Sequence, residues 1–90
     1  MPNPPLKSLK ARAHGLKVVV IIGQSGLTES VLKEIETALY AHECIKIRVN
    51  AESKSDRSDI IQSACEALNA TLVQCIGHTA VLFKARDDNN

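Results

Sequence analysis

The stretch Val18-Val19-Val20-Ile21-Ile22, followed by Gly23-Gln24-Ser25-Gly26, decides how the rest of the chain is arranged. Its run of β-branched apolar residues predicts a strand that is buried on both faces. The two glycines permit a tight turn that leaves backbone amides open to solvent. Thr28 then suits the N-cap of a helix, and Glu29 places an anion in the first turn of that helix. A strand, a glycine loop and a helix N-terminus in this order can receive phosphate groups.

The size of the chain predicts one domain, residues 1–90, with an ordered core of about 5–85. No apolar run approaches the ~20 residues that a membrane helix needs, and the start lacks the apolar segment of a secretory signal. Cys44, Cys65 and Cys75 are widely spaced, and each lies in an apolar stretch. They are therefore expected to be free thiols in the core, without zinc-ligand spacing. We expect a soluble, cytoplasmic protein without a membrane partner.

Charge is unevenly distributed along the chain, although the net charge is only +1. Residues 1–27 carry four cations and no acid, whereas residues 28–43 carry one lysine and four acids. This distribution favours one surface that faces a polyanion and one solvated face. Scattered charge that serves only solubility is the alternative.

Apolar periodicity predicts seven elements. They are a helix at 5–14, a strand at 17–22, a helix at 28–42, a strand at 44–49, a helix at 54–69, and strands at 71–76 and 79–84 joined through Gly77-His78. Ser53 begins a capping box for the third helix, and Asn69 suits the left-handed position that ends it. The order α-β-α-β-α-β-β predicts an α/β two-layer sandwich with a mixed four-stranded sheet, parallel across helices and antiparallel in the last hairpin.

The stretch Cys44-Ile45-Lys46-Ile47-Arg48-Val49 alternates apolar and polar residues. This period of two is typical of a strand with one covered face. Lys46 and Arg48 are therefore expected to emerge together on the side opposite Ile45, Ile47 and Val49.

The loop Gly23-Gln24-Ser25-Gly26 belongs to neither of two common nucleotide motifs. It is too short for a Walker A loop, and it lacks the third glycine of a dinucleotide fingerprint. An ordinary strand-to-helix turn remains one interpretation. The sharper one is a Gly-x-x-Gly clamp that holds the sugar-phosphate backbone of single-stranded RNA.

Several motifs in fixed order resemble a known family. They are Lys10-Ala11-Arg12-Ala13-His14, Val19 through Gly23, Gly26-Leu27-Thr28, Glu34-Ile35, Ala38-Leu39, His42-Glu43, Ile45-Lys46-Ile47, and the Gly77 hairpin before Val81-Leu82. Over about residues 6–84, the chain is similar to bacterial YhbY-type proteins, which are stand-alone CRM (chloroplast RNA splicing and ribosome maturation) domains. The resemblance implies a fold similar to the C-terminal domain of translation initiation factor 3. It also implies RNA binding without chemistry, on precursors of the large ribosomal subunit.

The resemblance also indicates which residues bind RNA. The family's loop falls on Gly23, Gln24, Ser25 and Gly26, and its basic surface falls on Lys7, Lys10, Arg12, Lys17, Lys46 and Arg48. Many members have asparagine at the position of Ser25, a basic residue at that of Gln24, and lysine or arginine at that of His78. The loop of this chain therefore offers amides but no charge of its own.

The leading hypothesis is an RNA-binding protein that assists assembly of the large ribosomal subunit, with ribosomal RNA as its partner. A protein-interaction module that docks on ribosomal proteins or assembly factors through the acidic second helix is the alternative. An enzyme with Cys44 as nucleophile and His42 or His14 as base lacks a motif for an oriented base or an oxyanion site. No catalytic residue, metal, cofactor or small-molecule substrate is expected.

Overall fold

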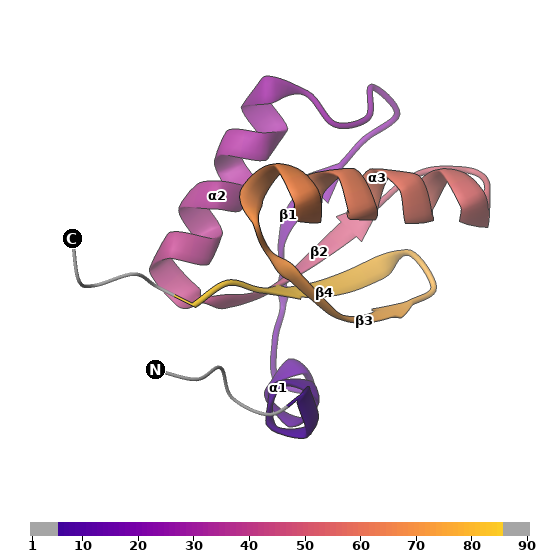
Figure 1. The fold of residues 1–90 in the computed structure, drawn as a ribbon. Coiled ribbons are helices and arrows are strands. Elements are labelled where there is room, and N and C mark those ends of the chain that lie inside the picture. The colour runs from indigo at the N-terminus through magenta and orange to yellow at the C-terminus, as the bar shows by residue number, and fades with distance from the viewer. Residues whose placement is uncertain (1–5, 86–90) are drawn as a thin grey trace.

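The computed structural model describes residues 6–85, and in this range the predicted element order is confirmed (Figure 1). The elements are α1 (Leu6–Ala13), β1 (Val18–Ile22), α2 (Glu29–His42), β2 (Cys44–Val49), α3 (Lys54–Leu68), β3 (Thr71–Ile76) and β4 (Thr79–Phe83). Pro5, the first residue of the predicted first helix and of the predicted core, lies outside the described residues. None of the described helices is long and apolar enough to span a membrane.

The four strands form one mixed sheet in the order β1-β2-β4-β3. β1 runs parallel to β2, and β4 is antiparallel to both of its neighbours. Figure 1 shows α2 and α3 on one face of this sheet. Between them lies the main core, in which Ile35 and Leu39 of α2 and Ile61 of α3 pack against the sheet. The predicted α/β sandwich with a mixed four-stranded sheet is confirmed.

Helix α1 lies on the opposite face of the sheet and adds a small third layer to the sandwich (Figure 1). Leu9 and Ala13 of this helix are buried in a second cluster with β-strand residues, namely Cys44, Val73, Val81 and Phe83. Because α1 has only eight residues, it covers only part of this face.

The predicted helix caps are confirmed. The Thr28 hydroxyl accepts a hydrogen bond from the Val31 amide at 3.2 Å, and the Ser53 hydroxyl accepts one from the Asp56 amide at 3.0 Å. Each bond satisfies an N–H group that has no acceptor within its helix. Asn69 adopts the left-handed conformation, with φ 55° and ψ 41°, and ends α3.

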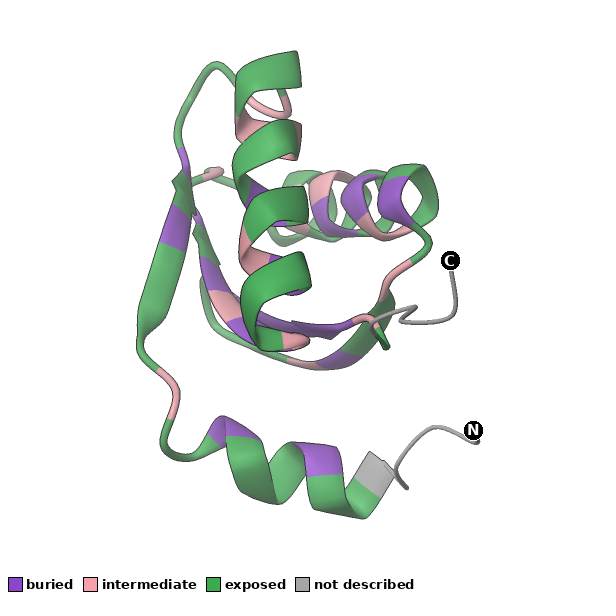
Figure 2. Cartoon of the chain, turned by 90° about the vertical axis from the view of Figure 1, so that its left-hand side faces the viewer, coloured by how far each residue is buried: buried purple, intermediate pink, exposed green. Residues whose placement is uncertain are grey.

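The prediction that β1 is buried on both faces is wrong. Val20 and Ile22 face the main core, but Ile21 is 58% exposed on the other side, and Val19, at a shift in the strand register, is 50% exposed beside α2. β1 is an edge strand, and α1 packs over β2, β3 and β4 instead. Figure 2 shows β1 rising from α1 along the margin of the sheet with exposed residues between its two buried ones. One side of β1 is therefore open to solvent.

We expect Leu9→Ala to release α1 from the sheet, because Leu9 (3% exposed) and Ala13 are the buried residues of this helix among those described. Truncating a buried leucine weakens docking by about 2 kcal/mol or more, and an isolated helix of this length is marginal in water. Hydrogen exchange should show loss of protection in α1 while α2 and α3 stay protected. Lys10→Ala, on the exposed side of α1, is the control; equal protection of α1 in both variants would contradict this packing.

Candidate nucleic-acid interface

The glycine loop is an exposed turn at the end of β1. The Gly26 amide donates a hydrogen bond to the Gly23 carbonyl at 3.0 Å, and Gly26 has a φ of +77°. Gly23, Gln24 and Ser25 are exposed, and a Cβ added at Gly23 would meet no atom within 4 Å. The Gly26 amide is thus used inside the turn. The Gln24 and Ser25 amides have no acceptor among the described residues, so they are the donors that the loop offers.

The strand β2 places two cations beside this loop. Ile45, Ile47 and Val49 are buried in the main core, and Lys46 and Arg48 lie on the other side of the sheet, as the alternation predicts. The Arg48 Nε atom donates to the Asn50 side-chain Oδ1 atom at 2.9 Å. The backbone N–H of Asn50 donates to the backbone carbonyl of Ile22, also at 2.9 Å. These bonds hold the Arg48 side chain where β2 ends next to the start of the loop.

The other predicted cations lie farther from the loop. Lys7, Lys10 and Arg12 are exposed on α1, and Lys17 is exposed just before β1. Since β1 separates Lys17 from Gly23, about 20 Å of extended chain lies between them. The ten predicted residues therefore form three separate groups: α1 with Lys17, the two cations of β2, and the loop, which lies at the opposite end of the molecule from α1 (Figure 2).

Positive and negative side chains are separated by layer. Residues 6–27 and the four strands carry six cations and no acid. We call the surface of these six residues the basic face: Lys7, Lys10, Arg12, Lys17, Lys46 and Arg48. Residues 28–43 and 50–70, which contain α2 and α3, carry eight acids and three cations. This segregation supports the interpretation of one polyanion-facing side.

A hollow of about 420 Å³ lies on the α3 side of the glycine loop. Gly23 and Gln24 line one wall, and Glu52, Asp56 and Asp59 line the other. Carboxylates are acceptors only and repel phosphate. These acids would therefore repel a polyanion that approached the loop from the α3 side.

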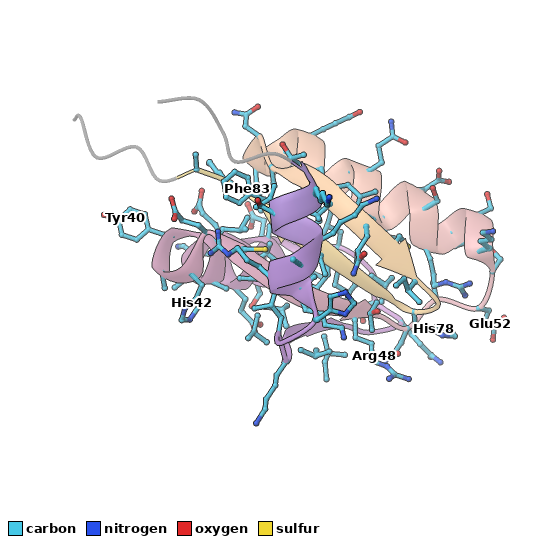
Figure 3. The ribbon with its side chains drawn as sticks, turned by 90° about the horizontal axis from the view of Figure 1, so that it is seen from below. Tyr40, His42, Arg48, Glu52, His78 and Phe83 are labelled. Atoms are coloured by element: carbon cyan, nitrogen blue, oxygen red, sulfur yellow. The ribbon has the colours of Figure 1, made fainter. Side chains whose placement is uncertain are left out.

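Two further residues lie at this edge of the sheet: His78, at a position where many family members have lysine or arginine, and Arg57, which no sequence motif indicates. Arg57 of α3 donates from Nη1 to the Ala51 carbonyl at 3.1 Å, and the same atom lies 3.4 Å from the Nε2 atom of His78. His78 is at the β3–β4 turn, and its carbonyl accepts from the Val49 amide at 2.7 Å. Figure 3 shows Arg48 and His78 at the same end of the molecule. Only the packing of α3 beside the hairpin brings Arg57 here, and no local motif signals it.

The thiol that was considered as a nucleophile is buried. Burial raises the pKa of the Cys44 thiol, and the nearby Arg12 guanidinium opposes part of that shift. Burial also raises the pKa of Cys65. A protonated, buried thiol is a poor nucleophile. The expectation of core thiols is confirmed for Cys44 but wrong for Cys75, which is exposed on the edge strand β3. Among the described residues, no group of three His, Cys, Asp or Glu side chains could hold a metal ion.

Comparisons with known proteins agree on one family. Residues 1–84 match the sequence profile of the CRS1 / YhbY (CRM) domain. An "RNA-binding protein" of Haemophilus influenzae is 42% identical over 80 residues, which cover 89% of this chain and 81% of the relative. A Pseudomonas aeruginosa protein, named as a probable RNA-binding protein, is 37% identical over 93% of this chain and 81% of its own length.

A solved structure has the same fold. The solution structure of a hypothetical Staphylococcus aureus protein, described as a candidate RNA-binding protein, superposes with a TM-score of 0.81. The two chains are 28% identical, and the match covers 94% of this chain and 88% of that one.

The three thiols differ in how far they are exposed, and this difference predicts the order in which they are alkylated. At a pH of about 8, iodoacetamide should modify the exposed Cys75 first and Cys44 at least about tenfold more slowly. Because burial raises the pKa of Cys44, its thiolate forms only at a higher pH than in the unfolded chain. Mass spectrometry of digested protein gives the rates, and denatured protein, in which the differences should vanish, is the control. Fast modification of Cys44 in folded protein would contradict its burial.

Proposed function

This chain belongs to the CRS1 / YhbY (CRM) domain family, and we propose that it binds RNA and assists assembly of the large ribosomal subunit in the cytoplasm. The observation that supports RNA binding is the basic face together with the exposed glycine loop. The residues of this part of the chain, 6–27 and the four strands, carry six cations and no acid. The names of the relatives support the same partner. The ribosomal part rests on the family resemblance.

In the proposed complex, the loop and β2 hold the RNA backbone together. The Gln24 and Ser25 amides and the exposed N-terminal amides of α2 donate to phosphate oxygens. Arg48 and Lys46 neutralise the phosphates that follow. Arg57, whose Nη1 atom lies 3.4 Å from the Nε2 atom of His78, extends this cationic edge past the end of β2. The acids beside Gly23 repel the RNA and keep it on the basic face. The RNA therefore runs from the loop across β1 and β2 toward α1.

The aromatic residues of this chain lie away from that path. Phe83 is 3% exposed beneath α1, and Tyr40 is 71% exposed on α2. Figure 3 shows Tyr40 at the end of the molecule opposite Arg48. Backbone contacts should therefore dominate over aromatic stacking, and sequence specificity should be weak.

A docking surface for basic ribosomal proteins or assembly factors is a second candidate. It is favoured by the exposed side of α2, where Glu34, Glu36 and Tyr40 are solvent-accessible. Partners that stay bound in pull-downs after nuclease treatment, and are lost with Glu34→Gln and Glu36→Gln, would support this candidate over direct RNA binding.

We expect the pair Lys46→Gln and Arg48→Gln to weaken binding to fragments of large-subunit ribosomal RNA by about tenfold or more at moderate salt. Loss of two phosphate contacts should reduce the slope of log affinity against log salt by about 1.4. Fluorescence anisotropy over a salt series measures both. The matched control is Lys33→Gln with Lys54→Gln, which removes the same charge from the helix layer. If the two double variants lost the same RNA affinity, the loss would come from net charge alone, and Lys46 and Arg48 would be refuted as a binding site.

We expect Gly23→Asp to lower RNA affinity more than Gly23→Ala, because it places a carboxylate where phosphate is proposed to lie. The position is open and its backbone needs no glycine, so both variants should fold, whereas a substitution at Gly26 would strain its φ of +77°. In sucrose gradients, the wild-type chain should sediment with precursors of the large subunit and Gly23→Asp should stay near the top. Cosedimentation of both variants would count against the loop, and absence of the wild type from these fractions would count against the ribosomal role.

A further inference from the structure

A single row of side chains crosses the sheet on the side of α1, beyond the part that this helix covers. In the strand register, Ile21 pairs with Arg48, Arg48 with Thr79, and Thr79 with Ile76. The row therefore runs through all four strands, Ile21–Arg48–Thr79–Ile76. Neighbouring residues, Ile22 with Val49 and Ala80 with Ile47, are buried in the main core, which places this row on the opposite face.

The two isoleucines at the ends of this row are strongly exposed. Ile21 is 58% and Ile76 is 66% exposed, although Val81 and Phe83, on the same side under α1, are at most 3% exposed. Because β1 and β3 are three strand spacings apart, about 14 Å of sheet with Arg48 and Thr79 lies between the two isoleucines, so the row offers one apolar contact at each end and polar groups in the middle. Among the described residues, nothing packs over this row.

We propose that this row is a platform for unpaired nucleobases of the RNA strand held at the glycine loop. The inference rests on the proposed RNA binding and adds a base-contacting surface to it. Charge complementarity argues for RNA: the strands carry no acid, Arg48 is in the middle of the row, and Arg57 lies beside the β3–β4 turn at its margin. A nucleobase has flat faces that pack against apolar side chains and polar edges that form hydrogen bonds, and it is attached to a negatively charged backbone, so it matches isoleucine side chains beside a guanidinium group.

The row also lies where an RNA strand bound at the glycine loop would pass next. Ile21 is two residues before Gly23, a distance of about 7 Å along extended chain. The Nε atom of Arg48 is used by Asn50, so its two terminal NH2 groups remain as donors for base edges or phosphate. The Thr79 hydroxyl donates to the Ile76 carbonyl at 2.9 Å, which leaves its oxygen free to accept from a base amino group.

The test separates base contacts from phosphate contacts. The probes are a fluorescent twelve-nucleotide oligoadenylate and an abasic ribose-phosphate oligomer of the same length. The variant Ile21→Thr with Ile76→Thr keeps β-branched residues but removes apolar surface, and Ile76→Phe enlarges the platform. Leu72→Thr is the matched control, because Leu72 is 44% exposed on the same strand as Ile76 but lies on the α3 side, beside Ile61 and Cys65.

We expect the double variant to bind oligoadenylate about tenfold more weakly than wild type, with an unchanged salt slope and unchanged affinity for the abasic oligomer. Ile76→Phe should bind oligoadenylate more tightly, and Leu72→Thr should match wild type. Folded Ile variants that bind both probes like wild type would refute the platform while leaving RNA binding intact. A wild-type chain that binds neither probe, nor ribosomal RNA fragments, would refute the proposed function itself. A wild-type dimer that the double variant dissociates, seen by sedimentation, would assign the row to a second copy instead.

Discussion

The alternation of side chains along β2 assigns each of its residues to one of two unlike environments. Ile45, Ile47 and Val49 are at most 1% exposed, and each contributes about 1.5–3 kcal/mol by burial. Lys46 and Arg48 project from the other side of the same backbone. A shift of one residue would bury two cations and expose three core residues, so the register of this strand is strongly constrained. The main core and the two β2 cations of the basic face therefore depend on the register of this strand.

The two faces of the sheet receive very different cover as a consequence. Helices α2 and α3 close the main core, whereas the eight residues of α1 cover only the part of the other face around Val81 and Phe83. The part of this face that α1 leaves uncovered contains Arg48 and borders the glycine loop, so it includes residues of the candidate interface. A short helix is thus compatible with both a stable second cluster and an accessible surface beside it, where we propose that RNA binds. Among residues 6–85, the acids, which would repel RNA there, are confined to the helix layer and its loops.

Local patterns predicted most of the fold, because caps and periodicity depend on neighbouring residues. Ser53, Asn69 and the β2 alternation are examples that the structure confirms. The exposure of β1 and of Cys75 was mispredicted, since a run of apolar residues does not reveal which strands lie at the edges of a sheet. For the candidate site, the family motifs indicated the loop and the cations of β2. Arg57 could not be found in this way, because it reaches His78 only through tertiary packing.

The separation of charge by layer gives the domain a permanent electric dipole that points across the sheet, although its net charge is only +1. A nearly neutral molecule with such a dipole is only weakly attracted to a polyanion from afar, but it experiences a torque as it approaches one. The domain would turn its positive side toward the nucleic acid before the first contact forms. Orientation during diffusion then shortens the search for a productive encounter, and dissolved salt should slow association as well as weaken the final complex.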